Sequence, residues 1–225
     1  MKKIILSALI LAQTAFAFGQ ETMSVNQVLS DHSVFDGVKS SSGKALKYEE
    51  ISGTPYTTKN FSNAKLADNY EQLPIRYNSY TDEIEFQKNG EISVLAKENK
   101  FSQIEITLPK QTIAFLDTSD ELSGYFFEVV RGKNTLYKKI KTKFIDAVPA
   151  ANSYASDRPA AFKTLDPIFY IKTEEGFIKK PRNQKEIIEY FPDKKENTTK
   201  FFKSNKIKFN KEEDLIKLVT FLNQN

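Results

Sequence analysis

The sequence predicts an α+β protein in which an antiparallel, hairpin-rich β-meander is followed by a C-terminal group of about three helices. Short segments that alternate apolar and polar residues, separated by turn sequences, dominate the middle of the chain. After Pro181 the apolar spacing changes to the 3.6-residue period of helices. Strands that precede helices, instead of alternating with them, are typical of an antiparallel sheet with its helices on one side or end.

Three turn sequences define the clearest hairpins of the predicted sheet. Asn89-Gly90 lies between two alternating segments, and both residues tolerate the positive φ angles of a two-residue turn. Similar turns occur around Gly132 and Gly176, at intervals of roughly 40 residues that also fit a repeat architecture. Because the side chains of the three hairpins match poorly, we favour a meander. The strand after the Gly132 turn is expected to cover residues 136–145.

Residues 147–167 are predicted to form a long irregular loop, because they contain three prolines and show no clean apolar period. A flap over the sheet and a plain linker are both open interpretations. Farther along, Asn183 can cap a first helix that Pro192 ends, and a second helix covers about residues 194–203. Asn210 and Glu213 have the spacing of a capping box for the last helix.

The first residues have the three-part layout of a secretory signal peptide. Lys2 and Lys3 precede an apolar run far shorter than the roughly 20 residues of a membrane-spanning helix. Small residues then fit cleavage after Ala17 or Gly19. We therefore expect residues 1–19 to be a signal peptide, and the mature protein to be periplasmic, cell-surface or secreted. A buried N-terminal helix is the alternative.

The rest of the chain is expected to form one domain. Residues 20–181 are its antiparallel β part, and residues 182–225 are a helical segment packed on it. A hydrophobic fraction of 40% argues against disorder. The absence of cysteine excludes disulfides, thiolate metal sites and lipid attachment through Cys. No later stretch approaches transmembrane length, and a net charge of +4, to which Lys2 and Lys3 contribute, gives no case for nucleic-acid binding.

Catalytic and metal-binding motifs are not apparent. His32 is the only histidine, and it is interpreted as an ordinary surface residue, so neither a Ser–His–acid triad nor a multi-His metal site is expected. The sequence has no P-loop, GxGxxG, HExxH or GxSxG pattern. We therefore predict no catalytic residue, no metal ligand and no cofactor.

Two groups of residues are candidates for a binding site. The first is Arg76, Tyr77, Asp82 and Glu85, for which buried Arg–acid pairing is the structural alternative. Glu85 shares a predicted strand face with Glu83, so paired carboxylates for glycoside hydrolysis, a calcium site and a solvated sheet face are further interpretations.

The second group is Lys139, Lys141 and Lys143, which alternate with apolar or small residues and are expected to lie on one strand face. No acidic residue occurs from Arg131 to Ile145. Such a stripe can contact an anionic glycan, lipopolysaccharide or membrane headgroups. Lysines on an edge strand also protect against aggregation, and this or a plain solvated face is the alternative interpretation.

Several segments resemble an exported Bacteroidetes protein family of uncharacterised function. They are residues 53–56, 73–78 with Asp82 and Glu85, 124–129, and the helical tail through Asp214, Leu215 and Asn223. The resemblance covers most of the mature chain. It implies a host type and export, without an activity or a set of catalytic residues.

These observations favour a non-enzymatic exported binding or scaffolding domain of the cell envelope, which contacts an envelope component or a protein partner. A carboxylate-dependent hydrolase of envelope polymers is the first alternative. A carrier that encloses a lipid-like ligand within a curved sheet is the second.

Overall fold

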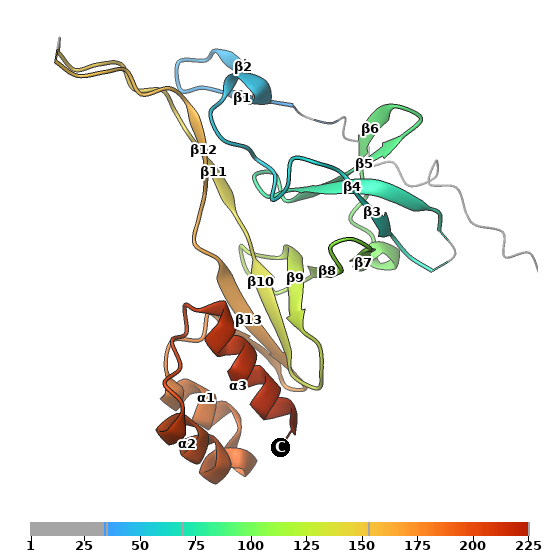
Figure 1. Cartoon of the computed structure of the whole chain (residues 1–225), viewed down its shortest axis with the longest axis vertical. Coiled ribbons are helices and arrows are strands. Elements are labelled where there is room, and N and C mark those ends of the chain that lie inside the picture. The colour runs from blue at the N-terminus through green and yellow to red at the C-terminus, as the bar shows by residue number, and fades with distance from the viewer. Residues whose placement is uncertain (1–33, 35, 69, 153, 225) are drawn as a thin grey trace, which may run out of the picture.

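A computed structural model describes residues 34, 36–68, 70–152 and 154–224 of the chain. The predicted signal peptide, both cleavage sites and His32 lie outside these residues. Figure 1 shows an elongated molecule with a large sheet, a group of helices at one end and a narrow two-stranded arm that projects from the sheet.

The main sheet has ten strands in the order β14-β13-β10-β9-β8-β7-β3-β4-β5-β6. These strands are β3 Ser62–Lys65, β4 Gln72–Asn78, β5 Glu83–Lys88, β6 Glu91–Val94, β7 Gln103–Ile106, β8 Gln111–Leu116, β9 Gly124–Val130, β10 Thr135–Lys139, β13 Ile168–Thr173 and β14 Gly176–Lys179. All neighbouring strands pair antiparallel, which confirms the predicted meander. The order departs from the sequence where β7 pairs with β3, and where β13 pairs with β10.

The Asn89-Gly90 hairpin forms as predicted. Lys88 pairs with Glu91, and the two turn residues have φ angles of 53° and 83°. The hairpins around Gly132 and Gly176 are also present, as β9–β10 and β13–β14. The three hairpins occupy unlike positions, because β6 and β14 are opposite edges of the sheet while β9–β10 is internal. This placement agrees with a meander and not with a repeat.

The predicted continuous strand over residues 136–145 is divided. β10 ends at Lys139, and the chain then leaves the sheet as β11 Thr142–Ile145, which pairs with β12 Ala161–Thr164. A bridge between Val148 and Arg158 continues this ladder toward the tip. We call residues 141–165 the arm.

The arm corrects the expectation of an irregular loop over residues 147–167. Its return strand lies inside that range, and the arm projects away from the sheet, so it is not a flap over it (Figure 1). Alanine and proline have low β propensity, and the pairs Ala150-Ala151 and Ala160-Ala161 with Pro149 and Pro159 conceal the strand pattern.

Three helices follow the strands, as predicted: α1 Gln184–Tyr190, α2 Lys195–Ser204 and α3 Glu212–Gln224. The Asn183 side chain caps α1 by accepting a hydrogen bond from the Glu186 N–H, at 3.0 Å. The predicted capping box at Asn210 does not form. Helix α3 instead begins at Glu212, and the Asp214 carboxylate accepts from the Lys208 N–H, at 3.1 Å.

The helices pack on the end of the sheet formed by β9, β10, β13 and β14. Their apolar core joins side chains of α1, α2 and α3 to Leu136, Phe169, Ile171 and Ile178. In addition, the Asn223 side chain accepts from the backbone N–H of Asn134, at 2.7 Å, and donates to its carbonyl, at 2.9 Å. The last helix is thereby fixed to the β9–β10 turn.

The remaining elements are short. β1 Gly37–Lys39 pairs with β2 Ala45–Lys47 beside the arm, and three short 3₁₀ helices cover Tyr48–Glu50, Asn99–Phe101 and Pro192–Lys194. None of the helices in the described part of the chain combines the length and apolar character needed to cross a bilayer.

Candidate interaction surface

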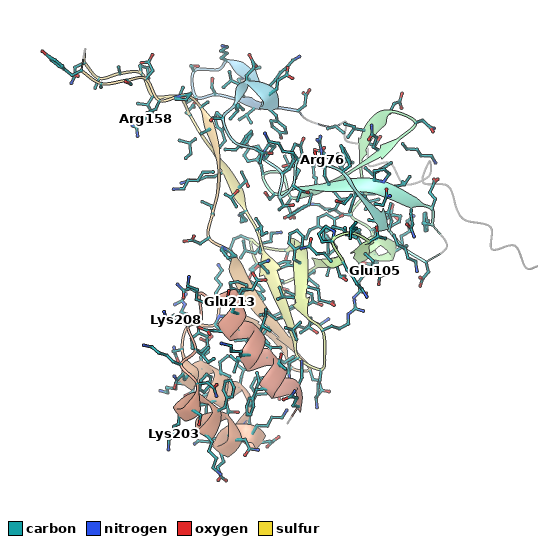
Figure 2. All side chains as sticks on the ribbon, viewed as in Figure 1. Arg76, Glu105, Arg158, Lys203, Lys208 and Glu213 are labelled. Carbon is teal, nitrogen blue, oxygen red and sulfur yellow. The ribbon has the colours of Figure 1, made fainter. Side chains whose placement is uncertain are left out.

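Arg76 and Glu85 form a buried ion pair between the adjacent strands β4 and β5. They face each other in register, with 2.6 Å between the guanidinium and a Glu85 carboxylate oxygen. The guanidinium also donates to the Tyr56 hydroxyl, at 2.8 Å, and Asn78 donates to Glu85. Because Glu85 is only 1% exposed, the solvated-face interpretation was wrong for it, and the alternative of buried pairing is confirmed. Figure 2 shows Arg76 among closely packed side chains.

Asp82 and Lys139 form a second ion pair that joins distant strands. The distance between the ammonium and a carboxylate oxygen is 2.6 Å, and Lys139 is 3% exposed. Burial lowers the pKa of the Lys139 ammonium, and the Asp82 carboxylate opposes this shift. The same carboxylate accepts from the Tyr77 hydroxyl, at 2.7 Å, from the Tyr125 N–H, at 3.3 Å, and from Lys97, at 3.4 Å.

This second pair shows that the sheet curls. Four strands, β9, β8, β7 and β3, separate β10 from β4 within the sheet, yet the turn after β4 contacts the end of β10. The enclosed core includes an edge-to-face contact between the Tyr77 and Phe127 rings, with centroids 5.8 Å apart. Asp82 and Lys139 therefore hold two distant parts of the sheet together.

The predicted lysine stripe is not one exposed face. Lys139 points into the core, whereas Lys141 is half-buried and Lys143 is exposed on the arm. Alternation would place all three on one face only in a continuous strand, and the strand is interrupted at residues 140–141. The structure thus pairs Arg76 with Glu85, joins Lys139 to Asp82 and Tyr77 in a separate contact, and leaves the other two lysines outside.

The base of the arm is anchored along both of its edges. On one edge, the Thr142 N–H donates to the Ser79 carbonyl, at 3.0 Å, and the two hydroxyls lie 2.8 Å apart. On the other edge, Ser52 exchanges backbone hydrogen bonds with Ala160 and Phe162. The arm therefore leaves the body in a fixed direction.

An aromatic cluster supports the inner face of the arm. Phe162 contacts Phe144 on the arm, and also Tyr48 and Tyr80 of the body, with ring centroids 5.2–6.0 Å apart. Gly53 allows the close approach on the Ser52 edge, because a Cβ at this position would lie 2.6 Å from the Phe162 carbonyl oxygen.

Side chains satisfy much of the backbone at the arm tip. The Asp157 carboxylate accepts from the Ala150 N–H, at 2.7 Å, and the Asn152 side chain accepts from the Tyr154 N–H, at 3.0 Å. The Tyr154 side chain is fully exposed. Figure 2 shows Arg158 on the projecting part of the arm, away from the sheet.

The arm concentrates the exposed apolar side chains of the described residues. Ile145, Val148, Tyr154 and Leu165 belong to it, and only Ile92 and Leu108 lie elsewhere among the six large hydrophobic residues that are exposed. Sequence reasoning missed this surface. The available signal was the order Thr-Lys-Phe-Ile in residues 142–145, which Ala-Phe-Lys-Thr in residues 161–164 mirrors.

The pocket nearest the first predicted group is shallow and polar. It is lined by Tyr48, Glu49, Ile51, Gly53, Thr54, Pro55, Tyr56, Lys59 and Arg76. The Arg76 guanidinium in this lining already binds Glu85 and Tyr56. Glu49 is the one carboxylate residue in the lining. Within the described residues, no three acidic, histidine or cysteine side chains are grouped so that they could hold a metal ion.

Comparisons with protein families, curated proteins and solved structures find no match to this chain. The resemblance to exported Bacteroidetes proteins stays a prediction.

We expect the two halves of the Asp82–Lys139 pair to contribute unequally to stability. Asp82→Ala leaves a buried ammonium without its carboxylate and places alanine at a φ of 58°, so the free energy of unfolding should fall by about 4 kcal/mol. Lys139→Met leaves Asp82 with Tyr77, Lys97 and a backbone donor, and should cost about 1–2 kcal/mol.

Urea denaturation at neutral pH measures both losses. Asparagine tolerates positive φ, so Asp82→Asn isolates the effect of charge. Its loss of unfolding free energy should lie between those of the other two variants. Equal losses for Asp82→Ala and Lys139→Met would contradict the assigned contacts.

Gly53→Ala should loosen the arm, and Gly90→Ala is its matched control. The two glycines have φ angles of 85° and 83°, but only Gly53 lies against another backbone group. We expect about 1 kcal/mol of destabilisation for Gly90→Ala and about 2–3 kcal/mol for Gly53→Ala. Limited trypsin digestion should cleave faster after Lys143 and Lys163 only in the Gly53 variant. Indistinguishable stability and cleavage in the two variants would exclude this role.

Proposed function

We propose that the protein is a non-enzymatic exported domain of the cell envelope that binds or scaffolds a partner through its arm. The observation that carries this proposal concerns the described part of the chain, where four of the six exposed large hydrophobic residues lie on one projecting element. Exposed apolar side chains that gather on one element are typical of interaction sites. The predicted signal peptide supports export.

The composition of the arm tip supports a contact role. Residues 150–156 contain alanine, serine, asparagine and Tyr154. Tyrosine offers a large contact area at a low entropic cost, and small polar neighbours adapt to a partner, as in antibody loops. Hydrogen bonds that the Asp157 and Asn152 side chains accept from the tip backbone reduce the cost of burying that backbone in an interface.

The two catalytic or carrier alternatives have less support. Of Glu83 and Glu85, the carboxylate pair that the sequence offered for hydrolysis, Glu85 is engaged by the Arg76 guanidinium, and the neighbouring Asp82 is engaged by Lys139. A carrier for a lipid-like ligand would need an apolar cavity inside the curled sheet. That space is instead filled with core residues such as Ile75, Ile84 and Tyr125.

A photo-crosslinking amino acid at position 154 tests the proposed contact in the producing cells. Position 108 is the control, because Leu108 is an 81% exposed hydrophobic residue on the body. We expect a discrete crosslinked adduct from position 154 and none of the same mass from position 108. Replacing residues 147–159 by Asn-Gly, which joins the arm strands by a two-residue turn, should abolish partner recovery in co-purification. The same adduct from both positions, or none from position 154, would count against the arm.

Export is tested by intact-mass analysis of the protein from its native host after fractionation. We expect a chain that begins at Phe18 or Gln20, in the periplasmic, surface or secreted fraction. An uncleaved chain in the cytoplasmic fraction would rule out the proposed location.

A further inference from the structure

Two lysines face each other across the arm. Lys143 on β11 pairs directly with Lys163 on β12, so their Cβ atoms lie about 5 Å apart. Both residues are exposed. Like charges in directly opposed positions destabilise a strand pair, so this arrangement has a cost in the free protein.

Most lysines on the strands of the main sheet are neutralised. Carboxylate oxygens lie within 3.2 Å of the ammonium groups of Lys65, Lys88, Lys138, Lys139 and Lys179, and Lys172 is the exception. By contrast, none of Lys141, Lys143 and Lys163 has a carboxylate within ion-pair distance among the described residues. The three arm lysines therefore form an unneutralised basic group, unlike most lysines on the strands of the main sheet.

Apolar side chains flank these lysines on the same face. The Leu165 N–H donates to the Lys141 carbonyl, which places Lys141 opposite Leu165, and Ile145 lies opposite Ala161. Leu165 and Ile145 are each 38% exposed. The nearest arm carboxylate, Asp146, accepts a hydrogen bond from the Ser41 N–H, at 2.6 Å, and is thus engaged by the body. We call the face that carries these three lysines, Ile145 and Leu165 the outer face of the arm. It combines three positive charges with exposed apolar surface.

We propose that this outer face of the arm binds an extended acidic polysaccharide. The inference rests on the proposed function, because it assigns a ligand class to the arm. Residues two apart on a strand are about 7 Å apart, so the lysines present separate charges along a narrow ribbon. A lysine ammonium acts as a point charge, which suits a polymer whose anionic groups are spaced along its length. The planar guanidinium of arginine would instead suit a single anion bound by two parallel hydrogen bonds. Ile145 and Leu165 can contact the apolar faces of sugar rings.

A linear polymer fits the arm better than a membrane surface. The tip extends beyond the lysines (Figure 1), so a bilayer that reached all three ammonium groups would have to follow the whole arm, including the carboxylate of Asp157. A polysaccharide can lie along the lysine face alone.

Calorimetric titration with a heparin decasaccharide tests this site. Lys143→Gln/Lys163→Gln should weaken binding at least tenfold, whereas Lys143→Arg/Lys163→Arg should keep it within about threefold. The matched control is Lys185→Gln/Lys200→Gln, which removes two exposed charges from the helices. Without ligand, the Lys143/Lys163 glutamine variant should melt at the same or a higher temperature, because the opposed charges are gone.

Three results would overturn the inference: no decasaccharide binding by the wild type, equal weakening in the helix control, or tighter binding to vesicles with 30% phosphatidylglycerol than to the decasaccharide. The variant with residues 147–159 replaced by Asn-Gly should keep polysaccharide binding. If polysaccharide binding is absent while crosslinking at position 154 persists, this inference fails and the proposed arm contact stands.

Discussion

The buried contact between Asp82 and Lys139 is the constraint on which the shape of the molecule depends. It joins the turn after β4 to the end of β10, although four strands lie between them in the sheet. The curled sheet encloses one apolar core on its inner side, and the helices form another on the β13–β14 end. Because the chain leaves the sheet directly after Lys139, the same contact also fixes where the arm begins.

Local chemistry accounts for what the sequence predicted. The Asn89-Gly90 turn and the Asn183 cap act over a few residues, so their patterns can be recognised without knowledge of the fold. The α+β class follows from the change of apolar period after Pro181. Long-range pairing is different. Nothing in the residues around Lys139 identifies Asp82 as its partner, because the curl of the whole sheet decides that these two side chains meet.

The candidate surface was only partly accessible to sequence reasoning, for two physical reasons. Period-two alternation assigns Lys139 and Lys143 to one face, but the two-residue interruption after β10 sends the first into the core and the second to solvent. The sequence predicts a loop in place of the arm because a ribbon exposed on both sides near its tip needs no apolar alternation. Alanine and proline therefore replace the residues that usually mark a strand.

The separation of the arm tip from every apolar core has a consequence for evolution. Among the described residues, none of 147–152 and 154–159 belongs to the apolar cores of the curled sheet and the helical end, and the aromatic cluster at the base includes only Phe144, Ala160 and Phe162 of the arm. Substitutions at the tip should therefore have little effect on the free energy of folding of the body. Related chains could acquire new specificities by exchanging this short segment while the scaffold stays constant, much as antibody domains diversify their loops.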